Sequence, residues 1–287
     1  MSGHVLVMGG TGKTGVRLSA RLRQAGWSAL SASRLPQDSG EIRSVAFDWY
    51  DPRGHDAALE CVERIYLVAP VGASDPIEVM GPFIERAIAK GACRFVLLSS
   101  SLIEEGGPAM GAVHALLRRG APGWAVLRPS WFMENFSVGQ HAATIRDEDA
   151  IYSATDDGLV PFIAVEDIVE VAFHALTEDE AVNEGLVITG PKALSYDQAA
   201  AIIGAARGRP VRHIRLNGEQ LTDRFRAIGL PDGYAAMLAG LDRAIAAGAE
   251  ARTTATVARM TGQEPQSLAV FAARSAGVWR TNVALDR

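Results

Sequence analysis

The chain has 287 residues, of which 48% are hydrophobic and 21% charged, a composition typical of a globular protein with a sizeable core. Its formal net charge of −5 lacks the positive surplus of nucleic-acid-binding and membrane-surface proteins, so we expect neither kind of partner. The two cysteines show no metal-ligand spacing, and there is no secretory leader and no apolar run of bilayer-spanning length. We therefore predict no metal site, no disulfide framework and a cytoplasmic location.

The first half of the chain alternates between short apolar runs and helical patterns. Strands are predicted at 4–8, 28–33, 44–47, 64–69, 94–99 and 124–127. Helices are predicted between several of them, at 13–25, 56–61, 76–90 and 110–119. Because strands that alternate with helices form parallel sheets with right-handed crossovers, this pattern predicts an α/β fold with a Rossmann-type doubly wound sheet.

The pattern changes after residue 127. Strands are predicted at 186–189 and 211–216, and helices at 165–177, 195–207, 232–247 and 265–273. Ser195 precedes its helix as an N-cap would. We divide the chain into a Rossmann core, 1–130, and a smaller, mainly helical C-terminal region, 131–287, which is interleaved with the core rather than joined to it by a linker.

A glycine-rich turn, GGTGKTG at 9–15, lies between the first predicted strand and the first predicted helix. Glycines let the backbone turn sharply and approach a pyrophosphate, which the helix N-terminus then binds. Gly-Lys-Thr resembles part of a P-loop, but that motif needs a glycine where Val7 stands. The turn therefore predicts a dinucleotide site, whose residues are Gly9, Thr11, Gly12, Lys13, Thr14 and Gly15.

The end of the second predicted strand indicates which nicotinamide cofactor is bound. NAD-specific sites place a carboxylate there for the ribose, whereas this chain has Ser33 and Arg34, which suit a 2′-phosphate. We therefore predict NADPH, although Arg34 alone is also compatible with a solvated surface charge. Further cofactor contacts are predicted from loops that follow the third, fourth and fifth strands, at Asp48, Ala69, Pro70, Val71 and Ser99.

Three stretches carry a family resemblance: GGTGKTG, the triple serine 99–101 and RPSWFMENF at 128–136. With them the chain resembles the NmrA-like atypical short-chain dehydrogenases/reductases, and within these the festuclavine dehydrogenase family of iminium reductases. The resemblance continues through Pro161–Ile163, Asp167, Thr189–Pro191 and Gly248–Glu250, and so covers nearly the whole chain. It implies a Rossmann fold, a nicotinamide cofactor and a small-molecule substrate.

The usual acid of short-chain dehydrogenases is missing. These enzymes use Tyr-x-x-x-Lys to protonate a nascent alkoxide, but none of the five tyrosines here has a lysine four residues later. The helix 110–119, where NmrA-like relatives often carry a lysine, contains none. Either the protein binds NADPH without chemistry, as NmrA-type sensors do, or its substrate needs no strong acid. An iminium ion fits the second case, because hydride addition gives a neutral amine directly.

The block after the sixth strand supplies candidate substrate contacts. Aromatic faces can hold a cationic ring and a carboxylate adds negative charge, so we predict substrate binding by Trp131, Phe132, Glu134 and Phe136. Core packing explains Trp131 and Phe136 equally well. As catalytic candidates we name Ser99, His114 and Glu134, while strand termination for Ser99 and simple packing for His114 remain open.

We therefore expect an NADPH-dependent imine or iminium reductase of alkaloid-like metabolites that is a monomer or homodimer. The alternatives are an NADP(H)-sensing regulatory protein without catalysis and an NADPH-dependent quinone or azo reductase.

Overall fold

The computed structural model describes residues 4–36, 43–73 and 75–280 of the chain. The N-terminal Met1–Gly3, which bear on the predicted absence of a leader, lie outside the described residues. The chain folds into two compact units. Unit 1 comprises 1–129, 165–188 and 256–263, and unit 2 comprises 130–164, 189–255 and 264–287. The chain thus passes between the two units several times.

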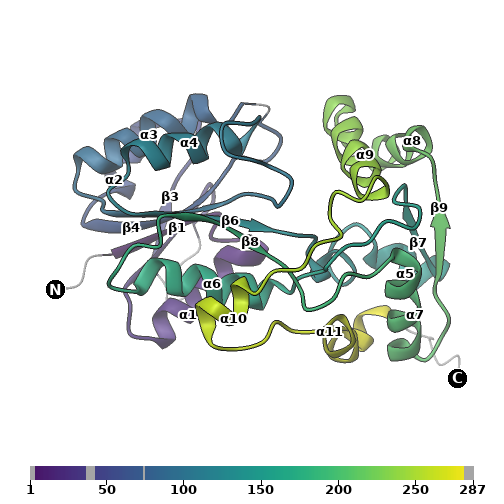
Figure 1. Ribbon diagram of the computed structural model, residues 1–287. Helices are drawn as coiled ribbons and strands as arrows, with labels where there is room; N and C mark the ends of the chain where they lie inside the picture. Colours follow the sequence, from purple (N-terminus) through teal and green to yellow (C-terminus); the bar gives the residue numbers. More distant parts are fainter. Residues whose placement is uncertain (1–3, 37–42, 74, 281–287) are drawn as a thin grey trace, which may run out of the picture. The chain divides into compact units, whose positions relative to one another are not determined.

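Unit 1 is built on a seven-stranded sheet with the order β3-β2-β1-β4-β5-β6-β8, in which every pairing is parallel (Figure 1). Its strands are β1 (His4–Met8), β2 (Ala29–Ser33), β3 (Arg43–Ala46), β4 (Val62–Val68), β5 (Arg94–Leu98), β6 (Trp124–Pro129) and β8 (Glu184–Ile188). The predicted α/β, Rossmann-type parallel sheet is confirmed. The strand predicted at 186–189 is its edge strand β8, which pairs with β6.

Helices cover both faces of this sheet, which explains why β1 is apolar from Val5 to Met8. Val5, Leu6 and Val7 have no exposed surface. One face carries α2 (His55–Ala58), α3 (Ile77–Ala89) and α4 (Met110–Gly120), and the other carries α1 (Lys13–Gln24), α6 (Val165–Thr177) and α10 (Thr256–Thr261), as Figure 1 shows. A short 3-10 turn (Pro52–Gly54) precedes α2.

Two ion pairs join α1 to α6 on the second face. Arg17 pairs with Glu166 at 3.0 Å and Arg21 with Glu170 at 2.7 Å. The residues that begin α6 are therefore fixed against the helix that follows the glycine turn.

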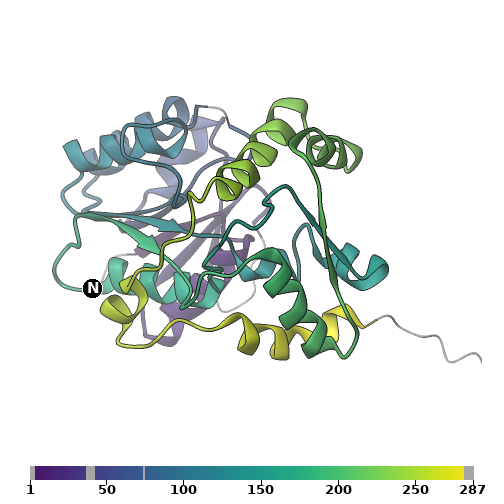
Figure 2. The same cartoon turned by 45° about the vertical axis from the view of Figure 1, so that its right-hand side comes forward.

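Unit 2 contains a two-stranded parallel sheet of β7 (Ala150–Ser153) and β9 (Arg212–Arg215). Its helices are α5 (Ala142–Glu148), α7 (Tyr196–Arg207), α8 (Gly218–Ala227), α9 (Asp232–Ala246) and α11 (Leu268–Ser275), with 3-10 turns at Met133–Asn135 and Ala276–Trp279. Helices α8 and α9 pack side by side, as both views show (Figure 1, Figure 2). Ser195 caps α7 through a capping box with Gln198, as its position predicted.

The core of unit 2 is aromatic. Phe136, Phe162 and Tyr196 are buried and lie edge to face, with ring centroids 5.1–6.0 Å apart. The indole Nε1 of Trp279 donates a hydrogen bond to the Phe136 carbonyl at 2.6 Å. This cluster ties the segment after β6 to the end of the described chain.

Among the described residues, no helix combines the length and the apolar character needed to cross a bilayer.

Candidate functional site

The glycine turn of unit 1 is closed against its own backbone. Gly9 has φ +63°, and the Gly12 N–H donates to the Gly9 carbonyl at 2.8 Å. A Cβ placed on Gly15 would lie 2.2 Å from the same Gly9 carbonyl oxygen, a contact that only backbone movement could relieve. Glycine is therefore required at both ends of the turn, for conformation at Gly9 and for close packing at Gly15.

The start of α1 is suited to an anion. Its N-cap is Gly12, which has no side chain to cap the first turn, and that turn carries no acidic residue. The first N–H groups of a helix need acceptors, and the positive end of the helix dipole favours a negatively charged one. The turn, with Thr11, and the helix start, with Lys13 and Thr14, thus fit the pyrophosphate of a dinucleotide.

The end of β2 lies beside the glycine turn, because the Gly10 N–H donates to the Ala32 carbonyl at 3.0 Å. Ser33 is the last residue of β2 and is half-buried, and Arg34 directly after it is exposed. Neither residue is acidic, so a ribose 2′-phosphate would meet a hydroxyl and a guanidinium here rather than a carboxylate.

The loops after β3 and β4 are joined to each other. The indole Nε1 of Trp49 donates to the Val68 carbonyl at 3.1 Å. Next to Trp49, Asp48 is half-buried and accepts from the Tyr50 N–H at 2.9 Å. Ala69 and Pro70 are half-buried, and Val71 is exposed. The structure thus places the four predicted residues of these two loops at the carboxyl ends of neighbouring strands, where ligands bind in parallel sheets.

The serine segment after β5 is held to the end of β6. The Ser99 N–H donates to the Leu127 carbonyl at 2.7 Å, and the Ser101 N–H to the Pro129 carbonyl at 3.0 Å. The Arg128 guanidinium donates to the Ser101 carbonyl at 2.9 Å and pairs with Glu104. Ser99 therefore has a fixed, half-buried position at the carboxyl end of β5.

His114 lies elsewhere in unit 1. Its ring packs against Trp124, the first residue of β6, at 5.4 Å between centroids, and against Gly185 near the start of β8. Burial lowers the pKa of the imidazole below its usual value. The structure does not bring His114 to the carboxyl ends of these strands, so packing accounts for its position and we do not include it in the proposed site.

The block at 131–136 lies in unit 2 and divides into two parts. Trp131 and Phe132 are half-buried, and backbone hydrogen bonds of 2.8–2.9 Å join this stretch to Ile163. Glu134 is buried, with 2% of its surface exposed. Phe136 has no exposed surface and belongs to the aromatic core, which leaves Trp131, Phe132 and Glu134 as predicted substrate contacts.

One buried pair in unit 2 was not predicted from the sequence. The Ser130 hydroxyl donates to Oε2 of Glu250 at 2.9 Å, and both side chains are buried. Ser130 stands inside the RPSWFMENF block and Glu250 ends the GAE stretch, both of which carry the family resemblance. Glu250 is an acidic residue in an alanine-rich segment, and this is the one feature of the sequence that could have marked it as a candidate. Its contact with Ser130 joins residues 120 positions apart, so no local sequence pattern predicts it.

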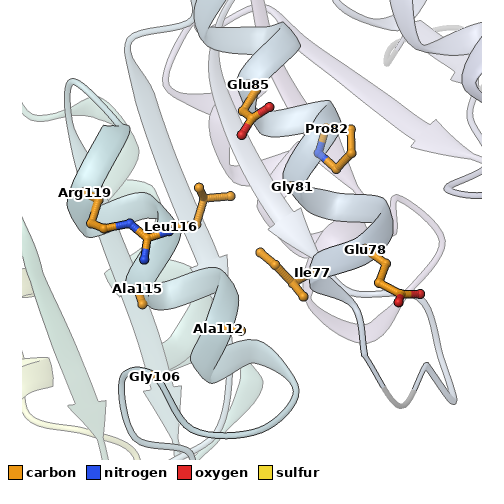
Figure 3. A pocket seen from close by; sticks show the side chains of 10 residues that line it. All are labelled: Ile77, Glu78, Gly81, Pro82, Glu85, Gly106, Ala112, Ala115, Leu116 and Arg119. Atoms are coloured by element: carbon orange, nitrogen blue, oxygen red, sulfur yellow. The ribbon is translucent and has the colours of Figure 1, made fainter.

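The groove drawn in Figure 3 is a different feature. It has a volume of about 610 Å³ and lies on unit 1 between α3 and α4, with Ile77, Gly81 and Leu116 among its lining residues. Its walls include none of the described residues that we predict to bind cofactor or substrate. We therefore do not place the site there.

Related proteins resemble the chain over nearly its full length. It is 44% identical over 275 residues to the oxidoreductase YesF of Bacillus subtilis (strain 168), which covers 96% of both chains. It is 40% identical over 288 residues to agroclavine dehydrogenase of Claviceps fusiformis, and 40% identical over 287 residues to festuclavine dehydrogenase easG of Aspergillus fumigatus. Each of these two likenesses covers 96% of this chain and 98% of the relative. No protein-family model matches the chain.

Solved structures share the fold. The NADPH-dependent quinone oxidoreductase QOR2 of Escherichia coli, complexed with NADPH, superposes with a TM-score of 0.81 at 20% identity, over 94% of this chain and 99% of that one. The triphenylmethane reductase of Citrobacter sp., complexed with NADP(H), gives a TM-score of 0.78 at 17% identity, over 95% of this chain and 99% of that one. At these identities the likeness establishes the fold.

Proposed function

We propose that this chain, which belongs to the family of festuclavine and agroclavine dehydrogenases among the NmrA-like atypical short-chain dehydrogenases/reductases, is an NADPH-dependent reductase of cyclic C=N bonds. Its similarity to these relatives supports an NAD(P)-dependent oxidoreductase that acts on small molecules. The preference for NADPH and for an imine or iminium substrate are the proposed parts.

The absence of a Tyr-x-x-x-Lys pair carries the proposal. Tyr66 and Tyr196 are buried, and burial raises the pKa of both phenols, so neither is suited to give up a proton. The phenol of Tyr152 donates to Glu148 at 2.7 Å, and none of the five tyrosines is followed by a lysine four residues later. A ketone would leave an alkoxide that needs an acid, whereas an iminium ion becomes a neutral amine without one.

The residues of unit 1 then have binding and orienting roles. The glycine turn and the start of α1 hold the pyrophosphate, and Ser33 with Arg34 hold the 2′-phosphate. Ser99, fixed by its backbone hydrogen bond to Leu127, orients the nicotinamide end. Bound NADPH supplies the hydride. Catalysis in such a site comes from proximity and electrostatics rather than from proton transfer.

Unit 2 contributes the substrate contacts. Trp131 and Phe132 offer ring faces to a planar cation, and Glu134 adds negative charge next to them in the chain. A neutral imine would first take a proton from solvent and then meet the same groups as an iminium ion.

Turnover with a small substrate panel tests the proposal. NADPH consumption is measured with a cyclic imine, an iminium salt, a quinone and a ketone, beside titrations of NADPH and NADH binding. We expect NADPH to bind more tightly than NADH, and oxidation with the imine and iminium but not with the ketone. Turnover of the quinone alone would favour quinone reduction, which the missing acid also permits. Tight NADPH binding without any turnover would favour a sensor, and failure to bind either nucleotide would overturn the assignment.

A further inference from the structure

The Glu250 carboxylate is an unusual group for a protein interior. It lies in the turn after α9, and only 2% of its surface is exposed. Oε2 accepts the hydrogen bond from Ser130, but Oε1 is buried without a hydrogen-bond partner among residues 4–36, 43–73 and 75–280. No basic side chain within these ranges forms an ion pair with Glu250. A buried carboxylate is costly unless it is paired, so this arrangement calls for a positively charged partner that the described residues do not supply.

The position of this carboxylate links it to the ends of two strands. Ser130 is joined by one peptide bond to Pro129, the last residue of β6, and Thr189 likewise follows the last residue of β8. The Thr254 N–H donates to the Thr189 hydroxyl at 2.9 Å. The stretch from Glu250 to Thr254 is therefore fastened at both ends to residues that directly follow two paired parallel strands, and ligands bind at the carboxyl ends of such strands.

The Ser130 contact fixes how the carboxylate is presented. One carboxylate oxygen is engaged by a neutral donor, which orients the group without neutralising it. The other oxygen keeps its full capacity for a cation. In a buried setting of low dielectric, that attraction is far stronger than it would be in water.

We propose that Glu250, oriented by Ser130, is the carboxylate that pairs directly with the positively charged nitrogen of the substrate, in addition to the negative charge that Glu134 contributes. This inference rests on the proposed reduction of C=N bonds and names the charged form, the iminium ion, as the species bound. The hydride from NADPH adds to the carbon of the C=N⁺ bond, the π electrons become the nitrogen lone pair, and no proton is needed. The product amine is neutral at that moment and loses the attraction to Glu250.

This chemistry predicts that Glu250 affects KM for the substrate and kcat differently. The carboxylate stabilises a charge that is full in the bound substrate and diminished in the transition state. It therefore strengthens ground-state binding more than it accelerates hydride transfer. Removing the charge should raise KM for a cationic substrate and leave kcat unchanged or higher. Glu250 is thus a specificity-determining residue rather than a proton donor.

Glu250→Gln tests the inference, because it keeps the size of the side chain and an acceptor for Ser130 while removing the charge. The probes are an N-methyl-dihydroisoquinolinium salt as the cationic substrate and menadione as a neutral one. We expect KM for the cation to rise about tenfold or more in Glu250→Gln, with kcat not reduced. NADPH affinity should stay unchanged, and so should any rate of menadione reduction that the wild type shows. Glu264→Gln, at an exposed position of unit 2, is the matched control and should behave as the wild type.

A second measurement is independent of turnover. N,N-dimethyl-tetrahydroisoquinolinium cannot be reduced, and in the presence of NADPH it should raise the melting temperature of the wild type but not of Glu250→Gln. An unchanged KM for the cation in Glu250→Gln, beside normal wild-type turnover, would overturn this inference and leave the proposed function standing. The quaternary cation could instead bind to the wild type but not to Glu250→Gln, while the iminium salt is not reduced. That result would overturn the proposed function and support the cation site. Absence of cation binding in both proteins would overturn the site itself.

Discussion

Asp242 gives a prediction whose size follows from the structure. The residue lies on α9 with 6% of its surface exposed, and its carboxylate accepts from the Ala154 N–H at 2.9 Å. Burial raises the pKa of Asp242 from 3.8 to about 6, and the hydrogen bond from Ala154 only partly opposes this rise. Because the folded-state pKa is raised, the contribution of Asp242 to stability is full below pH 3.8 and is lost as the pH rises through about 6.

Asp242→Asn removes the free-energy cost of keeping a charged carboxylate buried at neutral pH. The amide oxygen of Asn still accepts the hydrogen bond from the Ala154 N–H. A pKa difference of about 2 units corresponds to about 3 kcal/mol at neutral pH, and this net value already contains the opposing hydrogen bond from Ala154. We therefore expect the free energy of unfolding to rise by about 3 kcal/mol near pH 7.5, or about 6–12 °C in Tm, and to change little near pH 4.

The assay is denaturant unfolding of wild type and variant at several pH values. Burial lowers the pKa of His141 to about 3, so its contribution is full above pH 6.5 and is lost as the pH falls towards 3. This opposite trend is present in both proteins and cancels in their difference. Asp232→Asn, on the first turn of α9 with its side chain 83% exposed, is the control. A stability difference between Asp242→Asn and wild type that does not vary with pH would refute the reasoning.

The remaining predictions concern the cofactor. Gly15→Ala places a Cβ 2.2 Å from the Gly9 carbonyl oxygen, so the turn must open. Losing two charge-assisted hydrogen bonds of about 1.5–3 kcal/mol each weakens NADPH binding by ~100-fold or more in a fluorescence titration. Gly240→Ala, where a Cβ meets nothing within 4 Å, should bind normally, and normal binding by Gly15→Ala would contradict the role of the turn. Arg34→Ala should weaken NADPH binding about tenfold and leave NADH binding unchanged, whereas an unchanged NADPH affinity would identify Arg34 as a surface charge.

The sequence predicts the parts of this protein that depend on local patterns. The glycine turn, the strand before it and the helix after it follow from residues that are neighbours in the chain. Helix Val165–Thr177 has the predicted bounds, and the capping box of Ser195 follows from the residue types at its helix start. In each case the signal and the structure lie within a few residues of one another.

Features that depend on distant residues could not be predicted in this way. Strand β7, Ala150–Ser153, has only four residues and becomes a strand by pairing with β9, about sixty residues later. The place of His114 depends on Trp124 and Gly185, which local patterns do not connect to it. The Ser130–Glu250 contact likewise arises only when the two segments fold together.

The most direct test of the central claim follows the hydride itself. The protein is given an N-methyl-dihydroisoquinolinium salt and NADPH that carries deuterium at the nicotinamide carbon from which hydride is transferred. Mass spectrometry and NMR then locate the label in the product. We expect a tertiary amine with one deuterium at the carbon of the former C=N⁺ bond, formed in step with NADPH consumption. Amine without the label, or NADPH that binds and is not consumed with the iminium salt, would contradict it.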